Sequence, residues 1–335
     1  MAIHFSVFSV FLSFETQRHR EHREDRTKDK MKKERSVRFS MFLFCLLLSF
    51  LHAEVIKKDF ITSLTRDGMD DSFYQKRVKQ RSARESFVIF QKLYENNFIG
   101  CKVPLKAVEE TEEFRIPQII HQIWLGSSVP ERFHQWMQSW AAWNGWEYKL
   151  WTDKDIETFP LYNRKLYDQS QNYGEKADIL RYEILFQEGG LYVDVDFECL
   201  QPEYFEYLHR TLDCYGGIEP LLHIYGSQPN AKSPIIGNAL LAAKPGHPLF
   251  KKLVEGLEQN VQQTSGLCPI LSTGPAYLSK CVMQYLPSNM SEKIVFFPAT
   301  YFFPSSYHCK HSSKEIIVFP ESAAIHYWVG SWIIE

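Results

Sequence analysis

The stretch from Glu175 to Leu200 constrains the fold of this 335-residue chain more than any other part of it. Apolar residues recur at helical spacing over Ala177–Gln187, and Gly189-Gly190 can take the left-handed conformation that often ends a helix. Leu191–Val195 is a short, apolar, β-branched run, which is typical of a buried strand. The stretch therefore predicts a helix followed directly by a strand that enters a sheet.

The preceding segment also alternates between strand and helix patterns. The apolar run after Pro117, with the sequence QIIHQIWLG, predicts a buried strand that ends at Gly126. A helix is expected from Pro130, where aromatic residues and Met recur three and four positions apart, and a second strand at Glu147–Trp151. This alternation predicts an α/β fold in which helices cover the faces of a parallel sheet.

The first 53 residues have the composition of a targeting segment, with ten Lys and Arg against six Asp and Glu. From Met31, the start that we favour, basic residues precede the apolar run Phe39–Leu51, and Ala53 follows at a plausible cleavage position. We therefore expect a cleaved signal peptide and an exported or secretory-pathway protein. An uncleaved signal-anchor, which would associate the N-terminus with a membrane, is the alternative.

The remaining chain divides into residues 54–114 and 115–335. The first part is charged, and its apolar residues recur at helical spacing around Phe87, Phe90 and Leu93, so we expect a helical arm ahead of the main domain. Six cysteines follow the leader without any C-x-x-C pair. Their spacing therefore indicates no zinc site, and disulfides and buried free thiols are both left open.

The composition excludes several classes of protein. A hydrophobic share of 44% with 15% aromatic residues argues against disorder. A formal net charge of −2 argues against a general nucleic-acid binder, which normally carries a basic excess. No stretch reaches the roughly 18 to 20 apolar residues needed to cross a bilayer, which excludes a polytopic membrane protein.

Two carboxylates lie at the C-terminal end of the strand predicted at Leu191–Val195. Residues i and i+2 of a strand point the same way, so Asp194 and Asp196 should converge at its C-terminal end. Adjacent carboxylates repel each other unless a cation compensates them, and hard oxygen ligands favour Mg²⁺ or Mn²⁺. Ligands of open α/β sheets bind beyond this end of the strands. The pair is therefore placed for a metal and a diphosphate; two solvated loop aspartates are the alternative.

The helix before that strand carries a second candidate pair. Asp178 and Arg181 are three residues apart near the start of the helix, so they lie on one face and can reach the same cleft. Arg181 offers a planar donor fork for phosphate or sugar hydroxyls, and Asp178 can accept hydrogen bonds from hydroxyls. A surface ion pair is the alternative interpretation.

Seven motifs in order along roughly residues 115–335 resemble a known family: IPQIIHQIWLG, KLWTD, ADILRYEIL, GGLYVDVD, NALLAAKPGHP, TGP and HYWVGSW. The chain resembles glycosyltransferase family 32, whose members carry a DXD sugar-binding motif and include yeast initiating mannosyltransferases and inositol-phosphoceramide mannosyltransferases. Clostridial glucosylating toxins share its core. The resemblance implies a GT-A fold, with a Rossmann-like mixed sheet flanked by helices. It also implies retaining transfer of a hexose from a UDP- or GDP-linked donor to a glycan, lipid or protein acceptor.

The same resemblance assigns roles to particular residues. Asp194 and Asp196 match the motif that holds Mn²⁺ or Mg²⁺ and, through it, the donor diphosphate. Asp178 and Arg181 match positions that bind the donor sugar, and we count Arg181 with the two motif aspartates as catalytic. Trp124 matches an aromatic residue that stacks on the nucleotide base, although the residues alone favour a packing role for it.

The C-terminal motif HYWVGSW is expected to fold over the donor. His326 is a candidate third metal ligand, while Ser331 and Trp332 are candidate contacts to the diphosphate. Trp328 fits packing equally well, and a lone histidine such as His326 is more often structural. Two further residues match recurring family positions near the acceptor side, without an assigned role: Asn238 and Thr273.

No carboxylate stands out as a covalent nucleophile, so a same-face displacement assisted by the leaving phosphate is the simpler expectation for retention. Two alternatives belong to other classes of protein. A phosphatase that uses a D-x-D motif is disfavoured because Phe197-Glu198 follows the motif where that family has Thr or Val. An exported sugar-binding protein without turnover is the other, and the intact set of acidic and basic residues argues against it.

Overall fold

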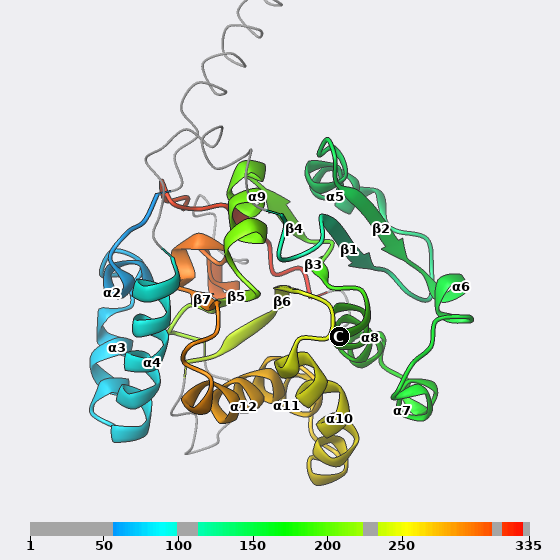
Figure 1. Cartoon of the computed structure of the whole chain (residues 1–335). Coiled ribbons are helices and arrows are strands. Elements are labelled where there is room, and N and C mark those ends of the chain that lie inside the picture. Colours follow the sequence, from blue (N-terminus) through cyan, green and yellow to red (C-terminus); the bar gives the residue numbers. More distant parts are fainter. Residues whose placement is uncertain (1–55, 99–112, 224–233, 310–316, 331–335) are drawn as a thin grey trace, which may run out of the picture. The chain divides into compact units, whose positions relative to one another are not determined.

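The computed structural model describes residues 56–98, 113–223, 234–309 and 317–330, and these form a mixed α/β fold (Figure 1). A six-stranded sheet with the order β2-β1-β3-β6-β5-β7 lies at its centre. The strands are β1 (Ile119–Ile123), β2 (Glu147–Trp151), β3 (Gly190–Val193), β5 (Cys214–Ile218), β6 (Ile236–Ala243) and β7 (Ile294–Phe297). A separate two-stranded ribbon pairs β4 (Phe197–Cys199) with β8 (Ala324–His326).

The sheet is mostly parallel, with one reversed strand. Strand β1 pairs parallel with β2 and β3, and β5 pairs parallel with β7, whereas β6 is antiparallel to both β3 and β5. The α/β class and the mixed sheet flanked by helices are confirmed. The all-parallel sheet predicted from the alternation of elements is wrong at β6, because that alternation was found only upstream of this strand. Antiparallel neighbours also need no crossover helix.

Helices lie on both sides of the sheet (Figure 1). One layer packs through α8, α10 and α12, while α5 and α9 lie on the opposite side. The helices after β1 are α5 (His134–Ala141), α6 (Asp153–Ile156), α7 (Arg164–Gln169), α8 (Tyr173–Gln187), α9 (Pro202–Thr211), α10 (Pro248–Gln263), α11 (Pro269–Ser272) and α12 (Pro275–Tyr285). Short 3-10 turns are η2 (Glu131–Phe133), η3 (Leu286–Ser288), η4 (Ala299–Tyr301) and η5 (Tyr307–Cys309).

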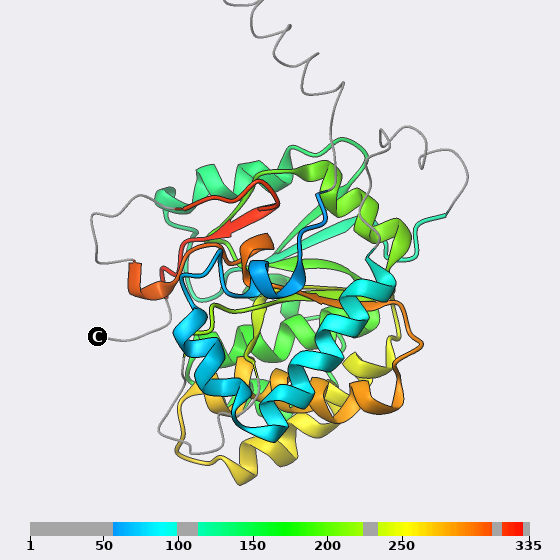
Figure 2. The same ribbon diagram turned by 90° about the vertical axis from the view of Figure 1, so that its left-hand side faces the viewer.

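The N-terminal helices share the hydrophobic core of the sheet. They are α2 (Phe60–Leu64), α3 (Asp71–Val78) and α4 (Arg81–Asn97), and Figure 2 shows them in blue and cyan in front of the sheet. The Phe98 ring lies 5.0 Å from that of Phe297 at the end of β7, and the Tyr94 and Tyr301 hydroxyls are 2.7 Å apart. Over residues 56–98, the helical segment is therefore built into the same compact unit as the sheet.

The leader expected over residues 1–53 lies outside the described residues. Within the described ranges, no helix combines the length and the hydropathy that crossing a bilayer requires. Four cysteines in these ranges are free thiols: Cys199, Cys214, Cys268 and Cys281.

The link from α8 to β3 places the strand against β1. Gly189 and Gly190 both have left-handed backbones, with φ of +68° and +95°. A Cβ atom on Gly190 would lie 2.6 Å from the Ile119 carbonyl oxygen and 2.9 Å from His121 Nε2. Only glycine fits here, because a side chain meets both an unfavourable φ and the backbone of β1. The predicted helix stop is confirmed.

We predict that Gly190→Ala lowers the free energy of unfolding by about 3 kcal/mol, since left-handed strain and a backbone clash add together. Gly246→Ala is the matched control, because Gly246 has φ +69° with open space around its Cβ position. It should cost only about 1 kcal/mol. Urea denaturation followed by circular dichroism measures both values, and equal losses in the two variants would contradict the steric account.

Candidate functional site

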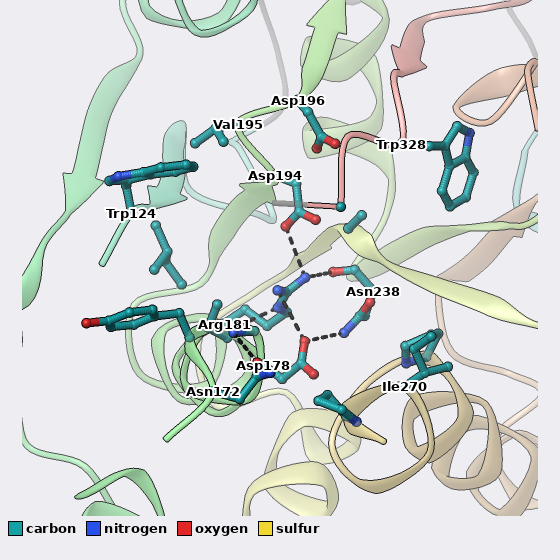
Figure 3. A pocket seen from close by; sticks show the side chains of 18 of the residues that line it. Trp124, Asn172, Asp178, Arg181, Asp194, Val195, Asp196, Asn238, Ile270 and Trp328 are labelled. Atoms are coloured by element: carbon teal, nitrogen blue, oxygen red, sulfur yellow. Dashed lines mark hydrogen bonds and ion pairs between the residues drawn. The ribbon is translucent and has the colours of Figure 1, made fainter. Parts of the chain in front are cut away.

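A cavity of about 1020 Å³ opens beyond the C-terminal ends of β1 and β3. Trp124 follows β1, and Asp194 follows β3, and both line the cavity. The first turns of α8 and Asn238 from β6 complete this part of the wall. Figure 3 shows Trp124 and Trp328 on opposite sides, with Asp194, Arg181 and Asn238 between them. The location agrees with the rule that open α/β sheets bind ligands at this edge.

Asp178 is a buried carboxylate with three partners. It is 7% exposed and lies on α8, which begins after the helix cap Asn172. Asn238 Nδ2 and Thr273 Oγ1 donate to its two oxygens, each at 2.7 Å, and Arg181 Nη2 lies 3.2 Å from Oδ1. Burial raises its pKa to about 6, although Arg181, Thr273 and Asn238 favour the charged form. Asp178 therefore ties α8 to β6 and to the segment after α11.

Arg181 connects helix α8 to the turn after β3. Its guanidinium is 5% exposed, and Nη1 donates to Asp194 Oδ1 at 3.1 Å and to the Asn238 carbonyl at 2.7 Å. It also lies over the Tyr192 ring, with 4.5 Å between Cζ and the ring centroid. Burial alone would lower the pKa of Arg181, but Tyr192, Asp194 and Asp178 raise it above its ordinary value. Most of its hydrogen-bonding capacity holds the walls of the cavity in place.

Asp194 and Asp196 lie in a tight turn and not in the strand. Strand β3 ends at Val193, two residues earlier than the sequence predicted, and the Phe197 N–H donates to the Asp194 carbonyl at 3.1 Å. The spacing of two strand residues therefore does not explain why the carboxylates converge. The turn brings them together, and Val195 packs beside Trp124 in a small cluster of apolar side chains.

The turn meets His326, which comes from strand β8. His326 Nε2 lies 3.1 Å from Asp196 Oδ1, and the Val329 N–H donates to Asp196 Oδ2 at 2.7 Å. One ligand atom from each of Asp194, Asp196 and His326 lies within 4.8 Å of the others. The structure thus brings these three residues together, although His326 follows Asp196 by 130 positions in the sequence.

The two aspartates of the turn differ in electrostatics. Burial raises the pKa of Asp194, with Arg181 opposing the shift and the neighbouring Asp196 adding to it. Burial would also raise the pKa of Asp196, but the His326 imidazole and the Val329 hydrogen bond hold it below its ordinary value. A carboxylate pair in which one member is difficult to ionise is the arrangement that a nearby cation would stabilise.

These three residues fit a divalent cation. Two hard carboxylate oxygens and one imidazole nitrogen suit Mn²⁺ or Mg²⁺. His326 Nδ1 is also buried and has no hydrogen-bond partner among the described residues, which is unusual for a buried ring nitrogen. With only three protein ligands, such a site keeps positions open for oxygens of a substrate.

The two tryptophans of the cavity have different surroundings. Trp124 packs against Phe133 at a ring distance of 5.1 Å and donates from Nε1 to Ser127 Oγ, so packing and exposure to the cavity coexist. Trp328 has a left-handed φ of +55°, and its Nε1 donates to the Ser305 carbonyl at 2.9 Å. The two other C-terminal candidates lie outside the described residues: Ser331 and Trp332.

Sequence reasoning missed several residues of the site. Tyr192 donates to Asp194 Oδ1 at 2.6 Å, but within the strand it looked like an ordinary apolar residue. The sequence places Asn238 and Thr273 near the acceptor side without a role, and the structure shows both as hydrogen-bond partners of Asp178. Glu219 also lines the cavity, and no motif marked it.

Comparisons with known proteins support the same class of site. Residues 130–210 match the family model described as the glycosyltransferase sugar-binding region containing the DXD motif. This range includes Asp178, Arg181, Asp194 and Asp196 but not His326. The resemblance stated above is confirmed over this part of the chain, which matches a glycosyltransferase sugar-binding region with a DXD motif.

Named relatives cover part of the chain. Inositol phosphoceramide mannosyltransferases 3 and 1 of Schizosaccharomyces pombe are 32% and 31% identical, over 54% and 51% of this chain. The matches span 51% and 53% of those proteins, about half of their length. Among solved structures, a PaToxG glycosyltransferase aligns with a TM-score of 0.40 at 16% identity, covering 69% of this chain and 82% of that one.

We predict that Mn²⁺ stabilises the protein through Asp194, Asp196 and His326. At about 100-fold above its Kd, the cation should add about 2.7 kcal/mol to the free energy of unfolding and raise Tm by roughly 5 °C. Asp196→Asn should abolish the shift, whereas Asp168→Asn on an exposed face of α7 should keep it. Thermal denaturation with Mn²⁺ and with EDTA measures the effect. An unchanged shift in Asp196→Asn would place the cation elsewhere.

We also predict that Thr273→Val lowers the free energy of unfolding by about 2 kcal/mol, because it removes a donor to the buried Asp178 carboxylate. Thr273→Ser keeps the hydroxyl and should cost less than about 1 kcal/mol, the value of one buried methyl group. Urea denaturation compares the two variants. Equal costs would show that Thr273 acts by packing and not through its hydrogen bond.

Proposed function

We propose that this chain is a metal-assisted glycosyltransferase that moves a hexose from a nucleotide diphosphate donor, UDP- or GDP-linked, to a hydroxyl group of an acceptor. One observation supports this above all others. The aspartates of the DXD motif and His326 converge in the same cavity as Asp178 and Arg181, which lie within the matched sugar-binding region.

The residues divide the work between the two ends of the donor. Asp194, Asp196 and His326 would hold Mn²⁺ or Mg²⁺, which when bound offsets the charge of the departing diphosphate as a Lewis acid. Arg181 fixes the position of Asp194 through the bond from Nη1. Trp124 offers a half-buried aromatic face to the nucleotide base. We also propose Ser331 and Trp332 as donor contacts, because they follow Gly330 in the sequence and Gly330 lines the cavity.

Asp178 and Arg181 lie where the donor sugar would meet the protein wall. Asp178 already accepts from Asn238 and Thr273, so we assign it chiefly to holding Arg181 and the wall, with sugar hydroxyls as additional donors. We further propose that transfer retains the anomeric configuration by attack from the face that the diphosphate leaves. The configuration of the product, read by proton NMR, checks this point.

The names of the relatives guide the choice of sugar and acceptor. Both named relatives from Schizosaccharomyces pombe are inositol phosphoceramide mannosyltransferases. We therefore propose mannose as the first sugar to test and a lipid-linked acceptor ahead of a glycan or a protein. A secretory-pathway location, set by the N-terminal leader, is part of the same proposal.

We predict slow, Mn²⁺-dependent hydrolysis of one donor by the full-length chain, tested with GDP-mannose and a panel of UDP-hexoses. EDTA should stop the reaction, and Asp194→Asn combined with Asp196→Asn should lower the rate at least about 100-fold, since no cation then offsets the diphosphate charge. Asp168→Asn is the matched control and should leave the rate unchanged. Nucleotide release followed by chromatography measures the rate.

The outcomes separate the alternatives. Donor binding without turnover, with or without added acceptors, would favour a sugar-binding protein that lacks catalysis. Phosphate release from a simple phosphomonoester would favour the phosphatase interpretation. Absence of binding to every donor in the panel would overturn the proposed function.

A further inference from the structure

A buried carboxylate lies in the cavity away from the proposed cation site. Glu219, directly after β5, is 4% exposed and lines the cavity wall. His223 Nδ1 lies 2.9 Å from its Oε2, and the other ring nitrogen of His223, Nε2, lies 2.8 Å from Ser306 Oγ. His223 and Ser306 are also buried, at 0% and 2% exposure. The three side chains form a connected series of hydrogen bonds from Ser306 through His223 to Glu219.

Two backbone N–H groups determine which atoms donate and which accept in this network of Glu219, His223 and Ser306. The Tyr307 N–H, which can only donate, points at His223 Nε2 at 3.4 Å, so Nε2 is an acceptor. The proton of a neutral imidazole is then on Nδ1 and is donated to Glu219. The His308 N–H donates to Ser306 Oγ at 3.2 Å, which leaves the Ser306 hydroxyl proton for Nε2. Every donor in the chain therefore points toward Glu219 and favours its role as an acceptor.

Glu219 lies at the end of the cavity marked by Trp328. The His223 ring contacts Trp328 edge-on at 4.8 Å, which connects the Glu219 network with that tryptophan. On the other side, Glu219 Cγ would be 3.2 Å from a Cβ atom on Gly237, the residue before Asn238. Asn238 belongs to the proposed donor-sugar wall. Glu219 is therefore next to the proposed sugar position. Trp328, which its network contacts, lies on the side of the cavity remote from Trp124 (Figure 3).

The walls around Glu219 are aromatic. Tyr307 and Trp328 both line the cavity. The backbone of Trp328 has an uncommon left-handed φ, and its indole is held in place by the hydrogen bond to the Ser305 carbonyl and by ring contacts. Flat aromatic faces pack against the apolar faces of ring compounds, while a carboxylate accepts hydrogen bonds from their hydroxyls. The combination suits a ring that carries several hydroxyls.

We propose that Glu219, Tyr307 and Trp328 form the acceptor subsite and that it takes a polyhydroxylated ring, a pyranose or a cyclitol, one hydroxyl of which donates to Glu219. The proposal rests on the proposed function, because the neighbouring part of the cavity then holds the donor. His223 and Ser306 are positioning residues that orient the Glu219 carboxylate. The cavity, at about 1020 Å³, is at the upper end of the range of about 300 to 1000 Å³ for single-ligand sites, which leaves room for a second ligand.

The test uses the full-length chain with Mn²⁺ and saturating nucleoside diphosphate, UDP or GDP, whichever binds. Saturation-transfer NMR then measures binding of two probes, methyl α-D-mannopyranoside and myo-inositol, which distinguish a pyranose from a cyclitol. We expect one probe to bind the wild-type protein, and Glu219→Gln to weaken it about tenfold, because a charge-assisted hydrogen bond is lost. The Kd of the nucleoside diphosphate should stay within about twofold, since Glu219 is outside the proposed donor contacts.

Two further variants make the result decisive. Glu188→Gln removes a partly buried, ion-paired carboxylate outside the cavity and should leave probe binding unchanged. Tyr307→Ala changes a partly exposed part of the cavity wall and should weaken probe binding about three- to tenfold. If Glu219→Gln does not fold, this variant tests the acceptor subsite in its place. Binding of neither probe, or equal binding to wild type and Glu219→Gln, overturns the acceptor subsite. Failure to bind any nucleoside diphosphate overturns the proposed function instead.

Discussion

The buried guanidinium of Arg181 is the interaction on which the rest of this site depends. A cation at 5% exposure is costly unless its charge and its donors are satisfied, and Asp178, Asp194 and the Asn238 carbonyl satisfy them. Because these partners come from α8, from the turn after β3 and from β6, one side chain fixes three elements. Removal of either carboxylate would weaken the compensation of this buried charge, so the elements that form the cavity wall depend on one another.

The same interaction explains how the two carboxylates of the turn can coexist. Arg181 compensates Asp194, while His326 and the Val329 N–H compensate Asp196. Each aspartate therefore has its own positive or donating partner on a different side. These partners offset part of the repulsion between the two carboxylates, and a cation bound between them would offset more of it.

Much of the fold followed from the sequence, because local patterns determined it. The strand at Glu147–Trp151 and the glycine pair after α8 depend on apolar spacing and on backbone conformation, which neighbouring residues reveal. The reversed strand β6 and the turn at Asp194 depend on pairing with distant segments, and no local pattern records that. The network of Glu219, His223 and Ser306 escaped for the same reason, since its members are joined only by folding.

The pairing of β4 with β8 determines when, during synthesis, the cation site can form. Strand β8 follows all six strands of the central sheet in the sequence, yet it supplies His326, and the Val329 N–H just beyond it bonds to Asp196, 133 residues earlier. A ribosome delivers these residues after all six strands of the sheet have been synthesised. The aspartate turn is therefore completed only after the sheet, and a chain that stops short of β8 can have most of this core without a finished cation site.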